Sequence, residues 1–392
     1  MPVFIRGGNM STQDKLLSPK IVFGFGARKR AGEYAKGFSA KKAMVVTDPG
    51  VSNAGWTRDV QKSLEEQGIE YVTYSSVTPN PRSTEVMDGS EIFRMQGCDV
   101  VIAIGGGSPM DCAKGIGVVA TNKKDILHFE GTDRISRSRP PFIFIPTTAG
   151  TSSDISRFCI ITNLHEYRKI AIVSNELVPD ISLIDPDVTA TMNEYLTACT
   201  GMDAMVHAIE AFVSTDATRH TDVHALKAIE IINQDLVALV RDINNHELRK
   251  RLMLASMKAG LAFSNAVLGA VHAMAHSLGG LKDLAHGECN ALLLDHVVNF
   301  NFPSAPERFR VIAETMKIDT RGMSNREVNR ALMNRIWEIK SSVGIDTHLE
   351  QKGIRLTDVP ALADNAQKDV CLLTNPRKAN KRDLEVIYED AL

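Results

Sequence analysis

Five short apolar segments alternate with helix-like segments between about Lys20 and Asp185. The apolar segments are KIVFGFG, KAMVVTD, EYVTYSS, DVVIAIGGG and FIFIP, and stretches such as TRDVQKSLEEQG lie between them. Alternation of strand and helix at this rhythm predicts a parallel sheet flanked by helices. A continuous run such as VVIAI fits a strand that is buried on both faces. Further short strands are expected at 158–162, 169–173 and 181–184.

After Pro186 the strand signal largely stops. The segments HALKAIEIINQDLVALVRDI, ELRKRLMLASMKAGLAFSNAVLGAVHAMAHSL and ALADNAQKDVCLL have helical periodicity and good helix formers. A chain of 392 residues is also too long for one ordinary core. We therefore expect an α/β domain over residues 1–186, followed by an all-helical domain over residues 187–392.

Charge and cysteine content narrow the class of protein. The net charge of -2 gives no electrostatic reason to expect nucleic acid or an anionic membrane as a partner. No apolar run is long enough to span a bilayer, and the opening MPVFIRGGNMSTQDKLL lacks the apolar core of a signal peptide. The six cysteines are scattered without a C-x-x-C pair, which indicates a reducing, cytoplasmic setting.

Two histidine-bearing segments in the second half indicate a metal site. Asp203 and His207 in GMDAMVHAIEA are four residues apart, so they share one face of a helix. His272, His276 and His286 in VHAMAHSLGGLKDLAHGE can supply further ligands, and the pattern alone does not separate His272 from His276. Carboxylate and imidazole without thiolate suit Zn²⁺, Fe²⁺ or another divalent first-row ion. The alternative is a helix pair held by Asp–His hydrogen bonds.

A glycine-rich turn in the first half is a candidate phosphate site. Gly105, Gly106 and Gly107 let the backbone approach a ligand closely, and Ser108 can begin a helix whose N-terminus favours phosphate. Asp48, at the end of KAMVVTD, can accept a hydrogen bond from a ribose hydroxyl and repel a 2′-phosphate. The acid precedes the glycines, so this is not the G-x-G-x-x-G arrangement. An ordinary tight strand-to-helix turn remains the alternative.

Taken together, these segments resemble the iron-containing, or group III, alcohol dehydrogenase family. The strongest stretches are AIGGGSPMDCAKG, IPTTAGTSSDISRF, GMDAMVHAIEAFVS, and NAVLGAVHAMAHSLGG through HGECNALLL. The similarity extends from about Pro19 to the C-terminus. The resemblance implies a Rossmann-like dinucleotide-binding domain, a helical domain and an active site in the cleft between them. It further implies NAD and Fe²⁺ (or Zn²⁺) as cofactors, and a homodimer or larger homo-oligomer.

Carried over by position, the resemblance assigns the metal ligands as Asp203, His207, His272 and His286. It places His276 near the nicotinamide and the substrate, as the candidate catalytic residue.

The resemblance also assigns residues to the nucleotide. Gly105, Gly106, Gly107 and Ser108 would hold the pyrophosphate, and Asp48 would favour NAD over NADP. The remaining cofactor-binding positions are Thr147, Thr148 and Lys169, with Asn80 and Phe158 nearby in the cleft. Departures from the family pattern fall at Met110, Ser153, Asp154, Ser277 and Ala285, and they affect pocket shape and substrate choice more than the chemistry.

The function expected from these residues is reversible hydride transfer between a small primary alcohol or diol and NAD. The metal acts as a Lewis acid on the alcohol oxygen, and His276 relays the proton outward. Alternatives are a non-redox lyase that resembles dehydroquinate synthase, an oxidoreductase that resembles glycerol dehydrogenase or maleylacetate reductase, and a noncatalytic binding protein. The small apolar segments TAG and AVLGA favour a small neutral alcohol over an anionic substrate.

Overall fold

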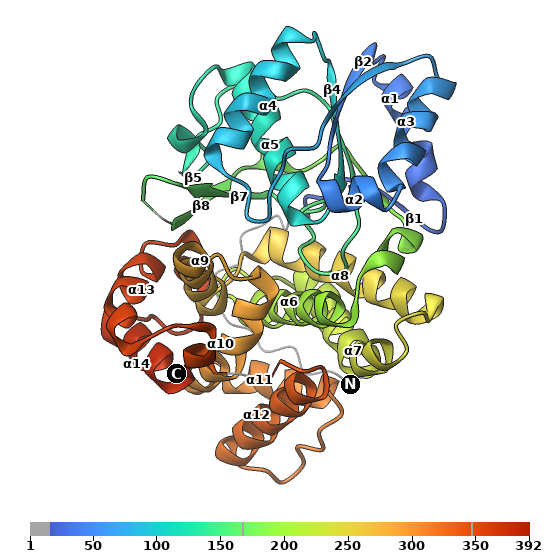
Figure 1. Ribbon diagram of the computed structural model, residues 1–392. Helices are drawn as coiled ribbons and strands as arrows, with labels where there is room; N and C mark the ends of the chain where they lie inside the picture. Colours follow the sequence, from blue (N-terminus) through green and yellow to red (C-terminus); the bar gives the residue numbers. More distant parts are fainter. Residues whose placement is uncertain (1–15, 167, 346–347) are drawn as a thin grey trace.

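A six-stranded parallel sheet forms the centre of the first half of the chain (Figure 1), in a computed structural model that describes residues 16–166, 168–345 and 348–392. Its strand order is β1-β9-β6-β4-β2-β3, and every pairing between neighbours is parallel. The strands are β1 (Lys20–Phe23), β2 (Lys42–Val46), β3 (Glu70–Tyr74), β4 (Val100–Gly105), β6 (Phe142–Pro146) and β9 (Ile181–Ile184). The predicted parallel sheet is therefore confirmed. Residues 1–15 of the opening segment, which was expected to lack a signal peptide, lie outside the described residues.

Helices cover both faces of this sheet, as Figure 1 shows. They are α1 (Ala31–Gly37), α3 (Trp56–Glu66), α4 (Ser83–Met95) and α5 (Gly107–Asn122). The short helix α2 (Pro49–Asn53) lies at the carboxyl end of β2 and has no buried residue. In β4, Ile102 packs into the cluster with α1 and α3, whereas Val101 and Ala103 pack into the cluster with α4 and α5. All six residues of β4 are buried, which is why its sequence is a continuous apolar run instead of an alternating one.

A second, smaller sheet lies beside the first. Its order is β5-β8-β7, with β5 (Gly131–Thr132), β7 (Phe158–Asn163) and β8 (Arg168–Val173). β7 and β8 pair antiparallel, and β5 pairs parallel to β8. The three additional strands expected from the sequence are thus present as β7, β8 and β9, but only β9 belongs to the main sheet.

The second half of the chain is helical over the residues that the structure describes. The helices are α6 (Glu194–Val213), α7 (Arg219–Arg241), α8 (His246–Ala266), α9 (Ala270–Lys282), α10 (His286–Asn301), α11 (Pro306–Thr315), α12 (Asn325–Ser342), α13 (Val359–Ala366) and α14 (Lys381–Ala391). Their buried side chains form the largest apolar cluster, with α6 at its centre. In the described ranges, no single helix has the length and apolar content to cross a bilayer; α8 and α9 pass that test only as a bent pair.

One expected helix is divided in two. The segment from 247 to 278 has uninterrupted helical periodicity, but α8 and α9 meet at 102°. The break occurs because Val267 takes a positive φ of 64°, and because Thr374 Oγ1 donates to the carbonyl of Leu268 (2.7 Å). Asn375 Oδ1 then accepts from the amide of Ala270 (3.1 Å), at the first position of α9. The bend directs the face of α9 that carries His272 towards α6.

Candidate active site

Asp203 and His207 lie one turn apart on α6, in the interior of the helical half. Their exposed fractions are 1% and 3%, and His207 Nε2 is 3.9 Å from Asp203 Oδ1. Burial of a lone carboxylate in apolar surroundings is costly, so the position requires positive charge or hydrogen-bond donors.

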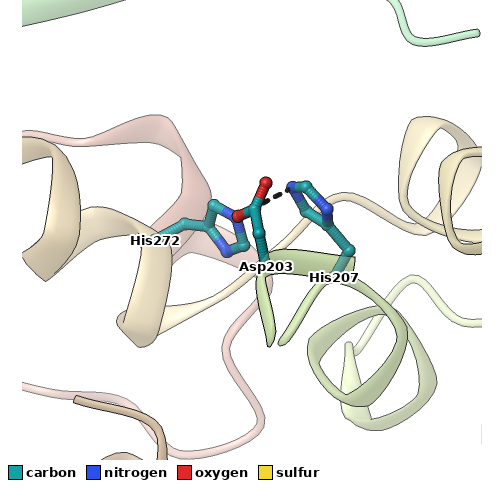
Figure 2. A group of neighbouring side chains, drawn as sticks. All are labelled: Asp203, His207 and His272. Carbon is teal, nitrogen blue, oxygen red and sulfur yellow. Dashed lines mark ion pairs between the residues drawn. The ribbon is translucent and has the colours of Figure 1, made fainter. Parts of the chain in front are cut away.

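Two further helices bring imidazoles to the same carboxylate oxygen. His272 Nε2, from α9, lies 3.9 Å from Asp203 Oδ1, and His286 Nε2, from α10, lies 3.8 Å from it. Figure 2 shows the rings of His207 and His272 on either side of the Asp203 carboxylate. His286 is the first residue of α10.

Gly287 permits the close approach of α10 to α6. A Cβ added at this position would lie 2.3 Å from the backbone oxygen of Cys199 and 3.3 Å from Asp203 Cβ. Only a glycine therefore lets the start of α10 pack against α6 closely enough for His286 to reach Asp203.

The donor set fits a divalent metal ion. Tetrahedral ligands with bonds of about 2.1 Å lie about 3.4 Å apart, so the observed separations of 3.8–3.9 Å need only a small contraction. Asn290 Nδ2 lies 2.6 Å from Asp203 Oδ1, 3.1 Å from His272 Nε2 and 3.2 Å from His286 Nε2. An amide with two hydrogens thus faces three acceptors, which shows that these acceptors converge on one point, as a cation requires.

Burial also keeps the imidazoles in the protonation state that metals bind. Burial lowers the pKa of His207 to about 4 and that of His272 to about 3, and it also lowers the pKa of His286 well below the ordinary value. The three rings are therefore neutral near pH 7, with a lone pair available for coordination.

His276 lies one turn beyond His272 but has a different partner. Its Nδ1 is 2.7 Å from Asp369 Oδ2, whereas the ligand atoms of Asp203, His207 and His272 lie within 4.8 Å of one another. Burial raises the pKa of Asp369, but the charge and hydrogen bond of His276 outweigh it and lower that pKa to about 2. The geometry therefore favours His272 as the ligand and His276 as its neighbour.

A cavity of 840 Å³ connects this centre with the carboxyl ends of the main-sheet strands. Its wall holds all the candidate metal and catalytic residues and every candidate cofactor residue except Gly105, the last residue of β4. The lining candidates are Asp48, Asn80, Gly106, Gly107, Ser108, Thr147, Thr148, Phe158, Lys169, Asp203, His207, His272, His276 and His286. Ligands of parallel α/β sheets bind at this end of the strands.

The N-terminus of α5 opens onto the cavity. The helix begins at Gly107, one residue before Ser108, and its N-cap Gly106 makes no side-chain capping bond. No side chain of the described residues caps the first amides of α5, and a helix N-terminus favours an anion. Thr148 Oγ1 is buried on the same wall without a hydrogen-bond partner among the described residues. Both features suit a phosphate-containing ligand.

Polar contacts join the two halves beside this wall. Lys169 Nζ donates to Asn80 Oδ1 (2.7 Å), and Asn80 Nδ2 donates to Asp283 Oδ1 (2.6 Å) at the end of α9. Asn80 N donates to Ser108 Oγ (3.2 Å), which ties this connection to the start of α5. These contacts link the start of α5 in the first half of the chain to the end of α9 in the second half.

Comparison with known proteins gives the family. Residues 18–186 match the family model for iron-containing alcohol dehydrogenase, and residues 197–392 match the C-terminal model of the Fe-containing alcohol dehydrogenase family. The chain belongs to the iron-containing alcohol dehydrogenase family. It is 41% identical over 380 residues to 1,3-propanediol dehydrogenase of Citrobacter freundii, which covers 96% of this chain and 98% of that protein. It is 35% identical to NAD-dependent methanol dehydrogenase of Bacillus methanolicus, over 96% and 99% of the two chains. A solved structure of 1,3-propanediol oxidoreductase superposes with a TM-score of 0.93 at 40% identity, over 96% and 99% of the two chains.

The expectations for family, fold class and enzyme class are therefore confirmed: this is an alcohol dehydrogenase of the iron-containing family. The assignment of individual residues to the metal and the cofactor stays a prediction that the geometry supports. Among the departures from the family pattern, Ser153 and Ala285 line the cavity, whereas Met110 is buried in the core.

Several residues around the site escaped the sequence analysis. They are Asp111, Glu210, Asp283, Asn290 and Asp369, and each makes a hydrogen bond to a candidate residue or to the loop beside it. A signal existed for Glu210, because it is a second acid in the same segment, GMDAMVHAIEA, as Asp203. Asp369 carried no such signal, since its partner His276 is 93 residues away in the sequence.

Proposed function

We propose that this chain catalyses reversible hydride transfer between a small primary alcohol or diol and NAD. The observation that carries the proposal is the position of Asp203 with three neutral imidazoles at one end of a cavity whose other wall holds the N-terminus of α5. Fe²⁺ and NAD are the cofactors; the family name and the NAD-dependent relative support them.

Asp203, His207, His272 and His286 would hold the metal. A divalent ion bound by them would supply Lewis acidity that lowers the pKa of an alcohol. Phe263 stacks on His207, with ring centroids 4.3 Å apart, and covers that ligand with an apolar surface. Exclusion of water from the ligands strengthens electrostatic interactions at the site.

His276 is the proposed proton acceptor for the alcohol. Because its Nδ1 is bonded to Asp369, Nε2 is the nitrogen left to take a proton, and His276 lines the cavity. Asp369 holds the orientation of the ring, as a carboxylate does for a general base.

The nucleotide lies along the opposite wall. The free amides at the start of α5 suit its pyrophosphate, and the unpartnered hydroxyl of Thr148 suits a second polar contact. Asp48 Oδ1 accepts from the amide of Val51 and caps α2. Its other carboxylate oxygen is then left for a ribose hydroxyl, which favours NAD over NADP.

The substrate is small and uncharged. Phe158, Phe263 and Leu268 give the metal end of the cavity an apolar wall, and the 1,3-propanediol dehydrogenase relative supports a short diol or alcohol. We propose further that residues 1–186 form the nucleotide-binding domain and residues 187–392 the metal-binding domain of a cytoplasmic homo-oligomer. The six buried free cysteines support a reducing compartment.

The test is NADH formation by purified protein reconstituted anaerobically with Fe²⁺ or Zn²⁺, across a panel of short alcohols and diols. We expect turnover that a chelator removes and the metal restores, and we expect His272→Ala to lose bound metal and turnover together. His224→Ala is the matched control, because His224 lies on α7 beside Lys258. Bound metal and NAD without net NADH formation would instead indicate a non-redox reaction. Normal metal content and activity in the His272→Ala enzyme would overturn the ligand assignment.

A further inference from the structure

Glu210 lies on α6 and points its carboxylate into the junction with α9. The residue is only 3% exposed. Its Oε2 is 2.6 Å from His272 Nδ1, and its Oε1 accepts from the amide of Val271 at 2.7 Å. One carboxylate thus contacts both the ring of His272 and the backbone just before it.

The space for this carboxylate depends on a glycine. A Cβ added at Gly269, the N-cap of α9, would lie 2.8 Å from Asn375 Oδ1 and 2.9 Å from Glu210 Oε1, so another residue here would press on both side chains. The chain therefore makes room at this point for an acid in an interior position.

The contact determines which nitrogen of His272 carries hydrogen. An ionised carboxylate offers only acceptors, so a hydrogen bond to Glu210 requires the proton on Nδ1. The lone pair is then on Nε2, which is the nitrogen that lies 3.9 Å from Asp203 Oδ1. A histidine that binds metal commonly has its other nitrogen held by a carboxylate in this way, and loss of that partner lowers metal affinity about 10- to 100-fold.

We propose that Glu210 is a positioning residue that fixes the tautomer and the ring orientation of His272 and thereby sets the affinity of the metal site. This inference rests on the proposed function, because it requires His272 to be a metal ligand. It assigns Glu210 a role beyond joining α6 to α9.

The substitution Glu210→Gln separates a role in orienting His272 from a role in joining α6 to α9. The amide has the same shape but only one oxygen, so it cannot accept from Val271 and from His272 at once. If the oxygen faces Val271, the NH₂ group faces His272 Nδ1, and the ring must place its hydrogen on Nε2, where it blocks coordination. If the oxygen faces His272, the NH₂ group faces the amide of Val271, and these two donors cannot form a hydrogen bond.

The experiment measures metal release from the Zn²⁺-loaded full-length enzyme into excess chelator, together with the affinity for Zn²⁺ by competition. We expect Glu210→Gln to weaken Zn²⁺ binding about 10- to 100-fold. The control is Asp235→Asn. Asp235 is a buried carboxylate on the neighbouring helix α7, and it accepts a hydrogen bond from Arg251 Nε (2.6 Å) on α8. We expect that variant to lower thermal stability without a specific loss of metal affinity.

Wild-type Zn²⁺ affinity in a folded Glu210→Gln enzyme would overturn the inference, as would an equal loss of affinity in Asp235→Asn. A second measurement does not depend on the variant: in ¹⁵N-histidine-labelled wild-type enzyme with Zn²⁺, His272 is expected to carry hydrogen on Nδ1. Hydrogen on Nε2 would contradict the proposal. If instead wild-type protein binds no metal, or binds it equally well after His272→Ala, the proposed function itself fails.

Discussion

Gly287→Ala tests whether the close contact between α10 and α6 forms the metal site. A Cβ at this position would lie 2.3 Å from the backbone oxygen of Cys199, and real Cβ contacts are essentially never below 3.0 Å. The obstacle is backbone, so it cannot rotate away. The start of α10 must therefore move by at least 0.7 Å.

His286 is the residue directly before Gly287 and moves with it. Metal–ligand distances are held within about 0.2 Å of their ideal values, so the displacement exceeds the tolerance of the site about threefold. Overpacking of this kind also lowers the free energy of unfolding by about 1–3 kcal/mol. We expect the alanine variant to fold, to retain less metal than wild type and to lose most of its turnover.

The assay combines metal stoichiometry, turnover on the best alcohol of the panel and thermal unfolding. Gly37→Ala is the matched control, because Gly37 ends α1, has nothing within 4 Å of a built Cβ and lies outside the positive-φ region. Normal metal content and turnover in Gly287→Ala would refute the reasoning, since His286 would then not need this contact.

Two other substitutions test the proposed ribose contact of Asp48 and the buried carboxylate of Asp154. Asp48→Gly removes the carboxylate proposed to contact ribose, so the ratio of kcat/KM with NAD to that with NADP should fall; an unaltered ratio would remove Asp48 from cofactor choice. Burial raises the pKa of Asp154 from 3.8 to about 6, so its contribution to stability is present below the ordinary pKa and is lost as the pH rises through about 6. Asp154→Asn does not titrate but can still accept from Ser182 Oγ, so its stability relative to wild type should rise by about 1 kcal/mol between about pH 5 and about pH 7.5. Denaturant unfolding at both pH values measures this difference, and a pH-independent difference would contradict it.

The sequence predicts the elements of this fold better than their directions. VVIAI is a strand because every side chain of β4 is buried, and Asp203 and His207 share a helix face because four residues make about one turn. The bend between α8 and α9 has no such local signal, since Val267 lies in an uninterrupted helical pattern. Its positive φ is imposed by contacts with residues more than 100 positions away, such as Thr374.

The same limit applies to the histidines of α9. His272 and His276 have equivalent spacing in the sequence, and the difference between them is the crossing of α9 over α6. That crossing sets His272 against Glu210 and Asp203, and His276 against Asp369. A single sequence contains each of these residues but not the helix crossing that pairs them.

The charges at the site explain why so polar a cluster can be buried. Asp203 and Glu210 are each at most 3% exposed, and burial lowers the pKa of the surrounding imidazoles, so the rings do not supply compensating charge near pH 7. Without a metal, burial also raises the pKa of Glu210 to about 7. A divalent ion brings two positive charges to a site with two carboxylates and thereby favours ionised Glu210, the form that accepts the Nδ1 hydrogen of His272. Metal binding and the hydrogen bond that orients its ligand therefore stabilise each other.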